Sequence, residues 1–226
     1  MQMDWARQCA VVIPCLNEAA AIESLVRQVR EKLPTVIVVD DGSTDATGEA
    51  ARRAGAEVLR HPHPEGKGAS LETGLKRARE LGFAAAIMMD GDGQHSPEDI
   101  PAFLQRAERS GAALIVGNRM ADARRMPWLR RQVNRAMSWR LSRIAGHELP
   151  DSQCGFRLIQ LEAWSKLRLQ SRHFEIESEM LLAAVAAGYA VEFVPIRVIY
   201  KSEQSKIHPV RDTLRWFRWL RGRRPG

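Results

Sequence analysis

Residues 83–110, FAAAIMMDGDGQHSPEDIPAFLQRAERS, hold the pattern that decides the fold. The apolar run predicts a buried strand over 84–90, and the serine–proline pair after it predicts a helix over 97–110. Two carboxylates, Asp90 and Asp92, stand at the exit of this strand. Because like charges this close repel each other, we expect a divalent cation, an arginine or bulk water to screen them.

The same alternation of short apolar strands and helices continues on both sides of this unit. Further strands are predicted at 10–14, 36–40, 56–60 and 112–118, and further helices at 19–33, 46–54 and 68–81. Alternating β and α elements indicate an α/β fold, with a mostly parallel central sheet flanked by helices. Ligands of such sheets collect at the carboxyl ends of the strands, where Asp41, Asp90 and Arg119 fall.

The pattern changes after residue 120. An arginine-rich amphipathic helix is predicted at 127–145, with Leu129, Val133, Ala136, Met137, Leu141 and Ile144 on its apolar side. A turn at 155–157 then leads into a strand, and a helix at 175–187 and strands at 190–195 and 197–200 follow.

The last segment predicts a helix with one aromatic and one basic arc. Trp216, Phe217 and Leu220 share the first arc, and Arg211, Arg215 and Arg218 share the second. A basic helix rich in Trp and Phe fits the interface of an anionic bilayer. The alternative is a helix that packs on its own domain or on a second subunit.

The net charge of +7 is unevenly placed, with arginines concentrated at 119–143 and 211–224. Such clusters suit an anionic partner: nucleic acid, a phospholipid surface or a phosphorylated substrate. No apolar run approaches the roughly 20 residues of a membrane span, and no signal peptide is recognisable. Three cysteines without CxxC spacing predict buried thiols in a reducing compartment. We therefore expect a cytoplasmic protein, peripheral on the inner face of the membrane.

Five stretches in this order closely resemble the family 2 glycosyltransferases, and among them the polyprenyl-phosphate glycosyltransferases of the dolichyl-phosphate mannose synthase type. They are VVIPCLNE (11–18), VVDDGSTD (38–45), GKGASLETGL (66–75), MDGDGQHSPED (89–99) and DSQCGFRL (151–158). The resemblance implies one domain over 1–226 with a Rossmann-like, nucleotide-sugar-binding fold of GT-A type. It implies a donor half at 1–120, an acceptor half at 121–207, and a basic amphipathic helix at 208–226.

The resemblance also implies site residues. For the nucleotide sugar they are Pro14, Leu16, Glu18, Val39, Asp41, Asp90, Gly91 and Asp92. For a Mg²⁺ or Mn²⁺ ion they are Asp90, Asp92 and Gln94, whose oxygens suit a hard cation shared with phosphates. For the acceptor phosphate they are Arg119 and Lys206, to which helix spacing adds Arg131 and Arg135. Catalytic roles would fall to Asp92, Arg119 and Asp151.

The implied reaction is inverting, metal-dependent transfer of a sugar from a GDP- or UDP-sugar to a polyprenyl phosphate. A phosphate acceptor is already an anion at neutral pH and needs cations to position it, which the arginines favour. A sugar or small-molecule hydroxyl would instead need a general base, and Asp151 is the candidate. This alternative stays open, as does a nucleotidyltransferase that uses the same pair of aspartates.

The resemblance and the charge pattern also predict the partners. We expect a nucleotide-sugar donor, a polyprenyl-phosphate acceptor and an anionic membrane surface, with a membrane-protein partner or a second copy of the chain also possible. Nucleic acid is not expected, because aromatic residues that could stack on bases are few outside the tail.

Overall fold

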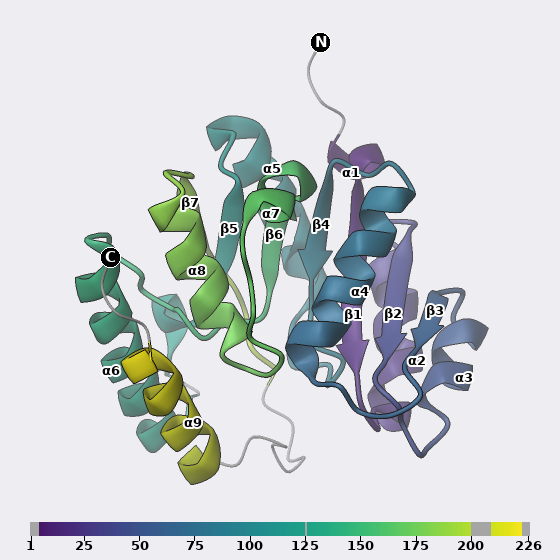
Figure 1. The fold of residues 1–226 in the computed structure, drawn as a ribbon. Helices are drawn as coiled ribbons and strands as arrows, with labels where there is room; N and C mark the ends of the chain where they lie inside the picture. Colours follow the sequence, from purple (N-terminus) through teal and green to yellow (C-terminus); the bar gives the residue numbers. More distant parts are fainter. Residues whose placement is uncertain (1–4, 125, 200–208, 223–226) are drawn as a thin grey trace.

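A seven-stranded sheet forms the centre of the computed structural model, which describes residues 5–124, 126–199 and 209–222 (Figure 1). Its strands are β1 (Cys9–Cys15), β2 (Val36–Asp40), β3 (Glu57–Arg60), β4 (Ala85–Met88), β5 (Leu114–Asn118), β6 (Arg157–Gln160) and β7 (Val191–Pro195). The order across the sheet is β3-β2-β1-β4-β6-β5-β7. All neighbours pair in parallel except β6, which runs antiparallel to β4 and β5. The predicted mostly parallel α/β sheet is confirmed.

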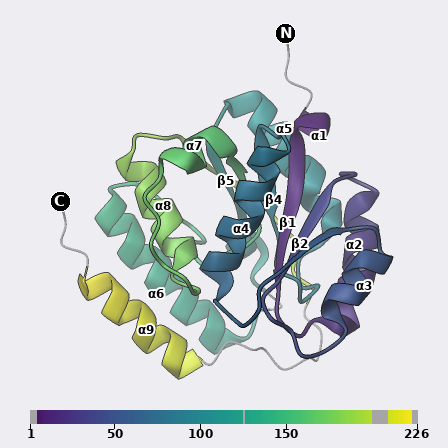
Figure 2. The same cartoon turned by 45° about the vertical axis from the view of Figure 1, so that its right-hand side comes forward.

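Helices cover both faces of this sheet. They are α1 (Trp5–Gln8), α2 (Ala19–Arg30), α3 (Thr47–Arg53), α4 (Lys67–Glu80), α5 (Ile100–Ser110), α6 (Trp128–Ala145), α7 (Leu161–Lys166), α8 (Ile176–Ala186) and α9 (Pro209–Gly222). Two 3₁₀ turns, Pro97–Asp99 and Arg119–Asp122, follow β4 and β5. Helix α4 crosses one face and α2 and α5 lie behind the sheet, while α6 and α9 run side by side at its β7 end (Figures 1 and 2). No described helix is long and apolar enough to cross a membrane.

The core lies between the sheet and these helices. Strands β1 and β2 are buried on both faces, as expected of central parallel strands covered by helices. A Cβ atom on Gly74 of α4 would lie 2.3 Å from Cγ1 of Val12, so glycine lets α4 approach β1 closely. The three cysteines are free and buried, as predicted, and burial raises the pKa of both Cys9 and Cys154 to about 12.

The predicted apolar side of α6 is confirmed at Leu141 and wrong at Leu129 and Ile144. Leu129 and Ile144 are exposed, at 63% and 44%, whereas Asn134, Ser138 and Leu141 face the interior. The physical reason is that the interior beneath α6 is polar: Ser138 Oγ lies 3.1 Å from Ser152 Oγ, and the Asn134 amide donates to Asp151. Apolar periodicity alone therefore misplaces the buried side of this helix.

Two other expectations changed, and one helix was not predicted. Over 197–199 there is no strand, only an isolated bridge between Val198 and His95, and α7 had no sequence signal. Trp216 of α9 is buried, and its Nε1 donates to Ser178 Oγ of α8 at 2.8 Å. At this residue the alternative holds: α9 packs on its own domain.

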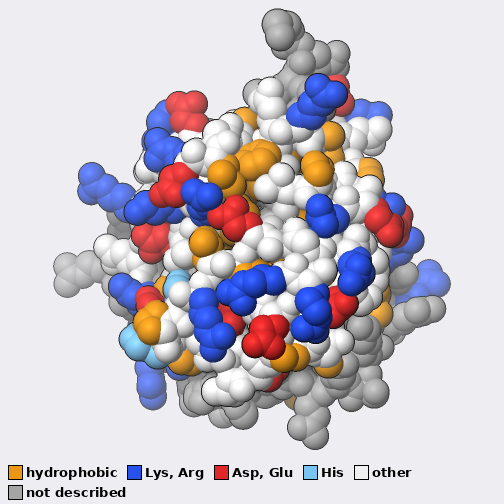
Figure 3. Space-filling view, turned by 90° about the vertical axis from the view of Figure 1, so that its right-hand side faces the viewer, with side chains coloured by type: hydrophobic (Ala, Val, Ile, Leu, Met, Phe, Trp, Pro, Cys, Tyr) orange, Lys and Arg blue, Asp and Glu red, His pale blue; other side chains and the backbone are white. Residues whose placement is uncertain are grey.

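The β3 edge of the molecule carries charges of both signs. Figure 3 views this side, which lies at the right of Figure 1, and shows basic and acidic side chains intermixed. Arg53 pairs with Glu23 at 3.1 Å, and Arg77 pairs with Glu57 at 2.6 Å. Such an edge presents no uniform field to an anionic partner.

Candidate active site

The loops after β1 and β2 are tied to each other at the carboxyl end of the sheet. Asn17 adopts a left-handed backbone conformation (φ 54°), which asparagine tolerates better than most residues. Its side-chain oxygen accepts from the Thr44 amide at 2.8 Å, and its own amide donates to Ser43 Oγ at 2.9 Å. Glu18 N also donates to Thr47 Oγ1 at 2.8 Å. The two loops therefore form one rigid rim.

Asp41 supports a third loop. Its carboxylate accepts from the amides of Glu65 and Gly66 at 2.9 and 2.8 Å and lies 2.7 Å from His61 Nδ1. Burial alone would raise the pKa of Asp41, but these hydrogen bonds outweigh it and lower that pKa. The side chain predicted to hold the nucleoside is therefore engaged in holding the 61–66 loop.

A lysine sits between two carboxylates at the end of β4. Lys67, the first residue of α4, pairs with Asp90 and lies 2.6 Å from Glu177 of α8. Burial opposes both charges, yet the ion pair holds the pKa of Asp90 at about 2 and raises the pKa of Lys67 above its usual range. Both groups are therefore charged at neutral pH.

Asp92 and His95 complete the acidic turn. Asp92 Oδ1 accepts from the Gln94 amide at 2.9 Å. Burial raises the pKa of Asp92, and the neighbouring charge of Asp90 raises it further. Burial lowers the pKa of His95, whose ring stacks on Phe156 with centroids 5.2 Å apart. A neutral histidine leaves the negative charge of the turn uncompensated on that side.

The turn fits a hard divalent cation. Carboxylate oxygens from Asp90 and Asp92 and the amide oxygen of Gln94 are the donors that Mg²⁺ and Mn²⁺ prefer. The Lys67 ammonium already shows that a cation is stable beside Asp90. Gly155 leaves room, because a Cβ atom there would lie 2.7 Å from Asp90 Oδ2. Within the described residues no cluster of three or more His, Cys, Asp or Glu could hold a metal, so phosphates and water would complete the shell.

Arg119 and Asp151, predicted separately, form one buried ion pair. Asp151 accepts from Arg119 Nε and Nη2 at 2.8 Å each and from the Arg119 amide at 2.9 Å, and Asn134 Nδ2 donates to it at 3.0 Å. Asp151 has no exposed surface. Burial would raise its pKa, but Arg119 outweighs burial and lowers it. The carboxylate is thus ionised and enclosed by donors.

Arg131 lies one turn before Asn134 on α6 and has an unmet donor. Its Nε is buried, with no hydrogen-bond partner in the described part of the chain, and the same holds for Asn134 Oδ1. A buried donor without an acceptor costs about 1–3 kcal/mol, which a bound anion would recover. Arg135, predicted to share the same phosphate, is exposed.

Other predicted residues occupy varied positions. Pro14 and Glu18 are half-buried at the end of β1, and Leu16 between them is exposed. The Val39 side chain is fully buried in the core, so the structure does not bring it to the site surface. A Cβ atom on Gly91 would lie 2.5 Å from Cys15 Sγ. Lys206 falls outside the described residues.

Sequence reasoning missed three charged residues at this site. Lys67 stands between Gly66 and Gly68 in the stretch GKGASLETGL, and these glycines signal a constrained turn. Glu177 gave no signal beyond its place in a helix. Arg157 is buried and donates to the carbonyls of Cys154, Ser152 and Glu177 at 2.7, 2.9 and 2.6 Å. It ties the 151–157 turn to α8.

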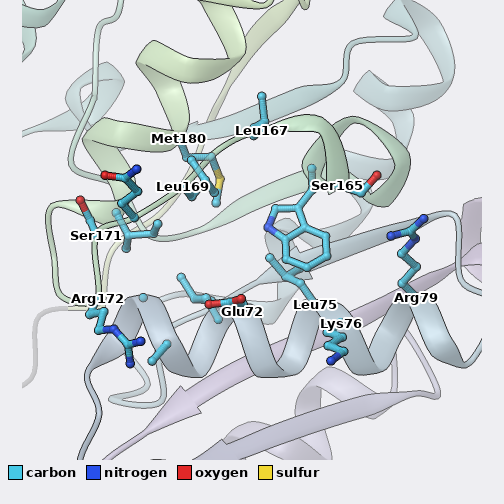
Figure 4. Close-up of a pocket in the computed structure, with 16 residues that line it drawn as sticks. Glu72, Leu75, Lys76, Arg79, Ser165, Leu167, Leu169, Ser171, Arg172 and Met180 are labelled. Atoms are coloured by element: carbon cyan, nitrogen blue, oxygen red, sulfur yellow. The ribbon is translucent and has the colours of Figure 1, made fainter.

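A groove of about 550 Å³ runs beside α4, on the side facing residues 164–172 (Figure 4). Arg172 and Arg79 stand at its two ends, with Glu72 and Leu75 between them, and Trp164 also lines it. Gly68 and Ile176, next in sequence to Lys67 and Glu177, also line it, so this end adjoins the ion-pair cluster.

Fold and site together define an α/β transferase of GT-A type, with an acidic turn at the carboxyl end of its central strands. The model of glycosyl transferase family 2 matches residues 10–168, and the chain belongs to that family. It is a glycosyltransferase.

Relatives named for lipid-phosphate acceptors match most of the chain. It is 29% identical to the UDP-N-acetylglucosamine–dolichyl-phosphate N-acetylglucosaminyltransferase of Methanococcus voltae, over 84% of this chain and 85% of that protein. It is 28% identical to the polyprenol monophosphomannose synthase of Mycolicibacterium smegmatis, over 82% and 75%. Glucosyl-3-phosphoglycerate synthase of Mycobacterium tuberculosis, solved with Mn²⁺, UDP and glucosyl-3-phosphoglycerate, shares the fold, with a TM-score of 0.71 at 22% identity over 94% of this chain and 76% of that one.

Proposed function

We propose that the protein transfers a sugar from a nucleotide diphosphate sugar to a polyprenyl phosphate, with a divalent cation at Asp90 and Asp92. The names of the two relatives support the lipid phosphate, and the Mn²⁺ and UDP of the structural neighbour support the donor and the metal. When bound, the cation would stabilise the charge of the departing diphosphate. Attack from the opposite side of the sugar would invert the anomeric carbon.

The buried Nε of Arg131, which has no hydrogen-bond partner among the described residues, is the observation that carries the acceptor assignment. A phosphate oxygen would satisfy this donor, and an arginine fork suits the geometry of phosphate. Arg131 lies on the same helix as Asn134, which contacts the buried Arg119–Asp151 pair. The anion would thus bind beside cations that are already fixed in place.

The hydroxyl alternative receives less support from this geometry. A general base must lie within hydrogen-bond reach of the acceptor hydroxyl. Asp151 is fully buried, and both its oxygens accept from Arg119. We infer instead that Asp151 positions Arg119, and that the phosphate acceptor attacks as an anion without a base.

Kinetics with two arginine variants test this assignment. With a short-chain polyprenyl phosphate in detergent micelles, Arg131→Gln should raise the acceptor KM about tenfold or more, because a charged hydrogen bond of about 1.5–3 kcal/mol is lost. Arg109→Gln removes an exposed arginine from α5, outside the proposed site and docking surface, and should leave the KM unchanged. Equal acceptor KM values for Arg131→Gln and the unaltered protein would refute the role of Arg131.

We also infer that the protein docks on a membrane through α6. Trp128 and Trp139 are 71% and 62% exposed and, about three turns apart, share one outer side of α6, with the exposed Leu129, Arg140 and Arg143 on the neighbouring arc. The Arg143 guanidinium lies 5.8 Å from the centroid of the Trp139 ring. Exposed aromatics beside arginines are typical of helices at an anionic lipid interface.

A further inference from the structure

Lys67 lies against one of the two carboxylates that we propose hold the cation. Its ammonium pairs with Asp90, one of the two proposed metal carboxylates, and it is held on the other side by Glu177 at 2.6 Å. Its side chain is only 12% exposed. The turn therefore contains a positive charge of its own before any metal binds.

Close backbone packing on both sides fixes the position of Lys67. Gly68 N donates to the Arg172 carbonyl at 2.7 Å, and a Cβ atom on Gly68 would lie 2.1 Å from the Ser171 carbonyl oxygen. The start of α4 is thus packed directly against the 171–172 backbone. Gly155 closes the other side, where a Cβ atom would lie 2.8 Å from the Lys67 nitrogen. The ammonium has little freedom to leave Asp90.

The position of Lys67 lowers the net negative charge of the acidic cluster. Asp90, Asp92 and Glu177 contribute three negative charges and Lys67 one positive charge, so the cluster carries two negative charges in place of three. A fixed ammonium a few ångströms from a divalent cation repels it, even when the charges are strongly screened. Two carboxylates also leave most of the six coordination positions of Mg²⁺ to other ligands.

We propose that Lys67 is a built-in countercation that keeps the Asp90–Asp92 turn metal-poor until a nucleotide diphosphate arrives, so that metal and diphosphate bind together. This inference rests on the proposed metal-dependent transfer. The diphosphate brings negative charge that offsets Lys67 and oxygen ligands that complete the metal shell. Lys67 thereby couples the affinity for the metal to the presence of the donor nucleotide.

Titration of the purified full-length protein with Mn²⁺, followed by the EPR signal of free Mn²⁺, tests the proposal without turnover. Without nucleotide, the unaltered protein should bind Mn²⁺ weakly, and Lys67→Gln should bind it about tenfold more tightly or better. Lys67→Arg keeps the charge and should bind weakly. Lys76→Gln removes a lysine from the same helix outside the cluster and should match the unaltered protein.

Two further measurements control for the unpaired carboxylates that Lys67→Gln leaves behind. Because Lys67→Gln leaves Asp90 and Glu177 unpaired, its melting temperature should fall without metal and recover on addition of Mn²⁺. The double variant Lys67→Gln/Glu177→Gln leaves no unpaired Glu177 charge but still frees Asp90, and it should also bind Mn²⁺ more tightly than the unaltered protein.

The outcomes separate this inference from the proposed function. If the unaltered protein binds Mn²⁺ only with UDP or GDP, and both Gln variants match it without nucleotide, the role of Lys67 is overturned and the metal site stands. If the unaltered protein binds no Mn²⁺ with either nucleotide, the proposed metal-dependent transfer fails. Tighter nucleotide-free binding in the Gln variants, but not in Lys67→Arg, supports the countercation.

Discussion

Gly155 shows how one missing side chain shapes the site. Its Cα faces both Asp90 Oδ2 and the Lys67 nitrogen, and a methyl group would lie 2.7–2.8 Å from each. Both contacts are with the ends of side chains, so a methyl group at residue 155 would displace the Asp90 carboxylate and the Lys67 ammonium from their present positions. The space at residue 155 therefore allows the present arrangement of Asp90 and Lys67.

We predict that Gly155→Ala weakens Mn²⁺ binding in the presence of UDP or GDP by about tenfold or more, because Asp90 must move. Its backbone does not need the left-handed region that favours glycine, so the far-UV spectrum should remain that of the unaltered protein. EPR titration measures the affinity. Unchanged Mn²⁺ affinity would show that Asp90 does not hold the metal.

Asp151→Asn should destabilise the protein by about 3–5 kcal/mol, because it leaves the Arg119 guanidinium buried without its carboxylate. Urea unfolding measures the loss. Glu162→Gln breaks an exposed pair with Lys166 and should cost less than about 1 kcal/mol. If the two variants lose similar free energies of unfolding, the buried Arg119–Asp151 pair is not a major source of stability.

The lowered pKa of Asp151 also fixes the sign of a pH effect. Its unfolded pKa is about 3.9, so its contribution is fully present above that pH and is lost as pH falls towards the lower folded pKa. The unaltered protein should therefore lose more stability between about pH 5 and pH 3 than Asp151→Asn does. Urea unfolding at each pH gives both slopes, and parallel slopes would refute the assignment.

The structure brings some of the predicted site residues together and leaves others apart. Asp90, Asp92, Arg119 and Asp151 could be predicted because strand ends and quoted motifs mark them. The partners Lys67 and Glu177 could not, since they lie 110 positions apart and meet only when α4 and α8 are placed. Pairing across that separation leaves no local pattern in the sequence.

Arg157 anchors one element to another. Its guanidinium donates to three backbone carbonyls and links the turn before β6 to the start of α8. Arg157→Lys keeps the charge but not the planar fork, so we expect a loss of about 2–4 kcal/mol from unsatisfied carbonyls. Thermal and urea unfolding test this, with Arg168→Lys in the loop after α7 as control. A loss below about 1 kcal/mol would contradict the anchoring role.

Helix α6 supplies the membrane prediction. Trp139→Ser should lower co-sedimentation with phosphatidylglycerol vesicles several-fold, because an exposed indole no longer enters the interface. Phosphatidylcholine vesicles serve as the neutral control, and thermal unfolding should be unchanged. Equal sedimentation of Trp139→Ser and the unaltered protein with the anionic vesicles would remove α6 from the docking surface.

Element boundaries followed the sequence where packing is apolar and departed from it where packing is polar. Strand β2 was predicted at its observed bounds because its residues are uniformly apolar up to Asp40. The buried side of α6 was misplaced because Asn134 and Ser138 face inward to meet Asp151 and Ser152. Hydrophobic periodicity carries no information about such polar interiors.

At the scale of the whole molecule, alternation of β and α units predicted the parallel sheet but not its full order. Strand β6 inserts antiparallel between β4 and β5, joining segments from either side of residue 120 in one sheet. A short strand from a turn gives no sign of which neighbours it will join. This insertion brings Asp151 and Gly155 to the carboxyl ends of β4 and β5.

The charge layout of the molecule agrees with a lipid-bound acceptor. The β3 edge mixes both signs, whereas the outer side of α6 combines arginines with exposed tryptophans. A protein docked through α6 would present the nearby Arg131 to a phosphate at the bilayer surface. The substrate and the membrane would then be recognised by the same helix.

The most direct test of the central claim compares two acceptors that differ only in a phosphate. The protein is incubated with Mn²⁺, radiolabelled UDP- and GDP-sugars, and either a polyprenyl phosphate or the matching polyprenol, and label is counted in the organic phase. We predict transfer to the phosphate alone, abolished by EDTA and by Asp92→Ala. Transfer to the polyprenol, or label that stays aqueous with every donor, would contradict the account.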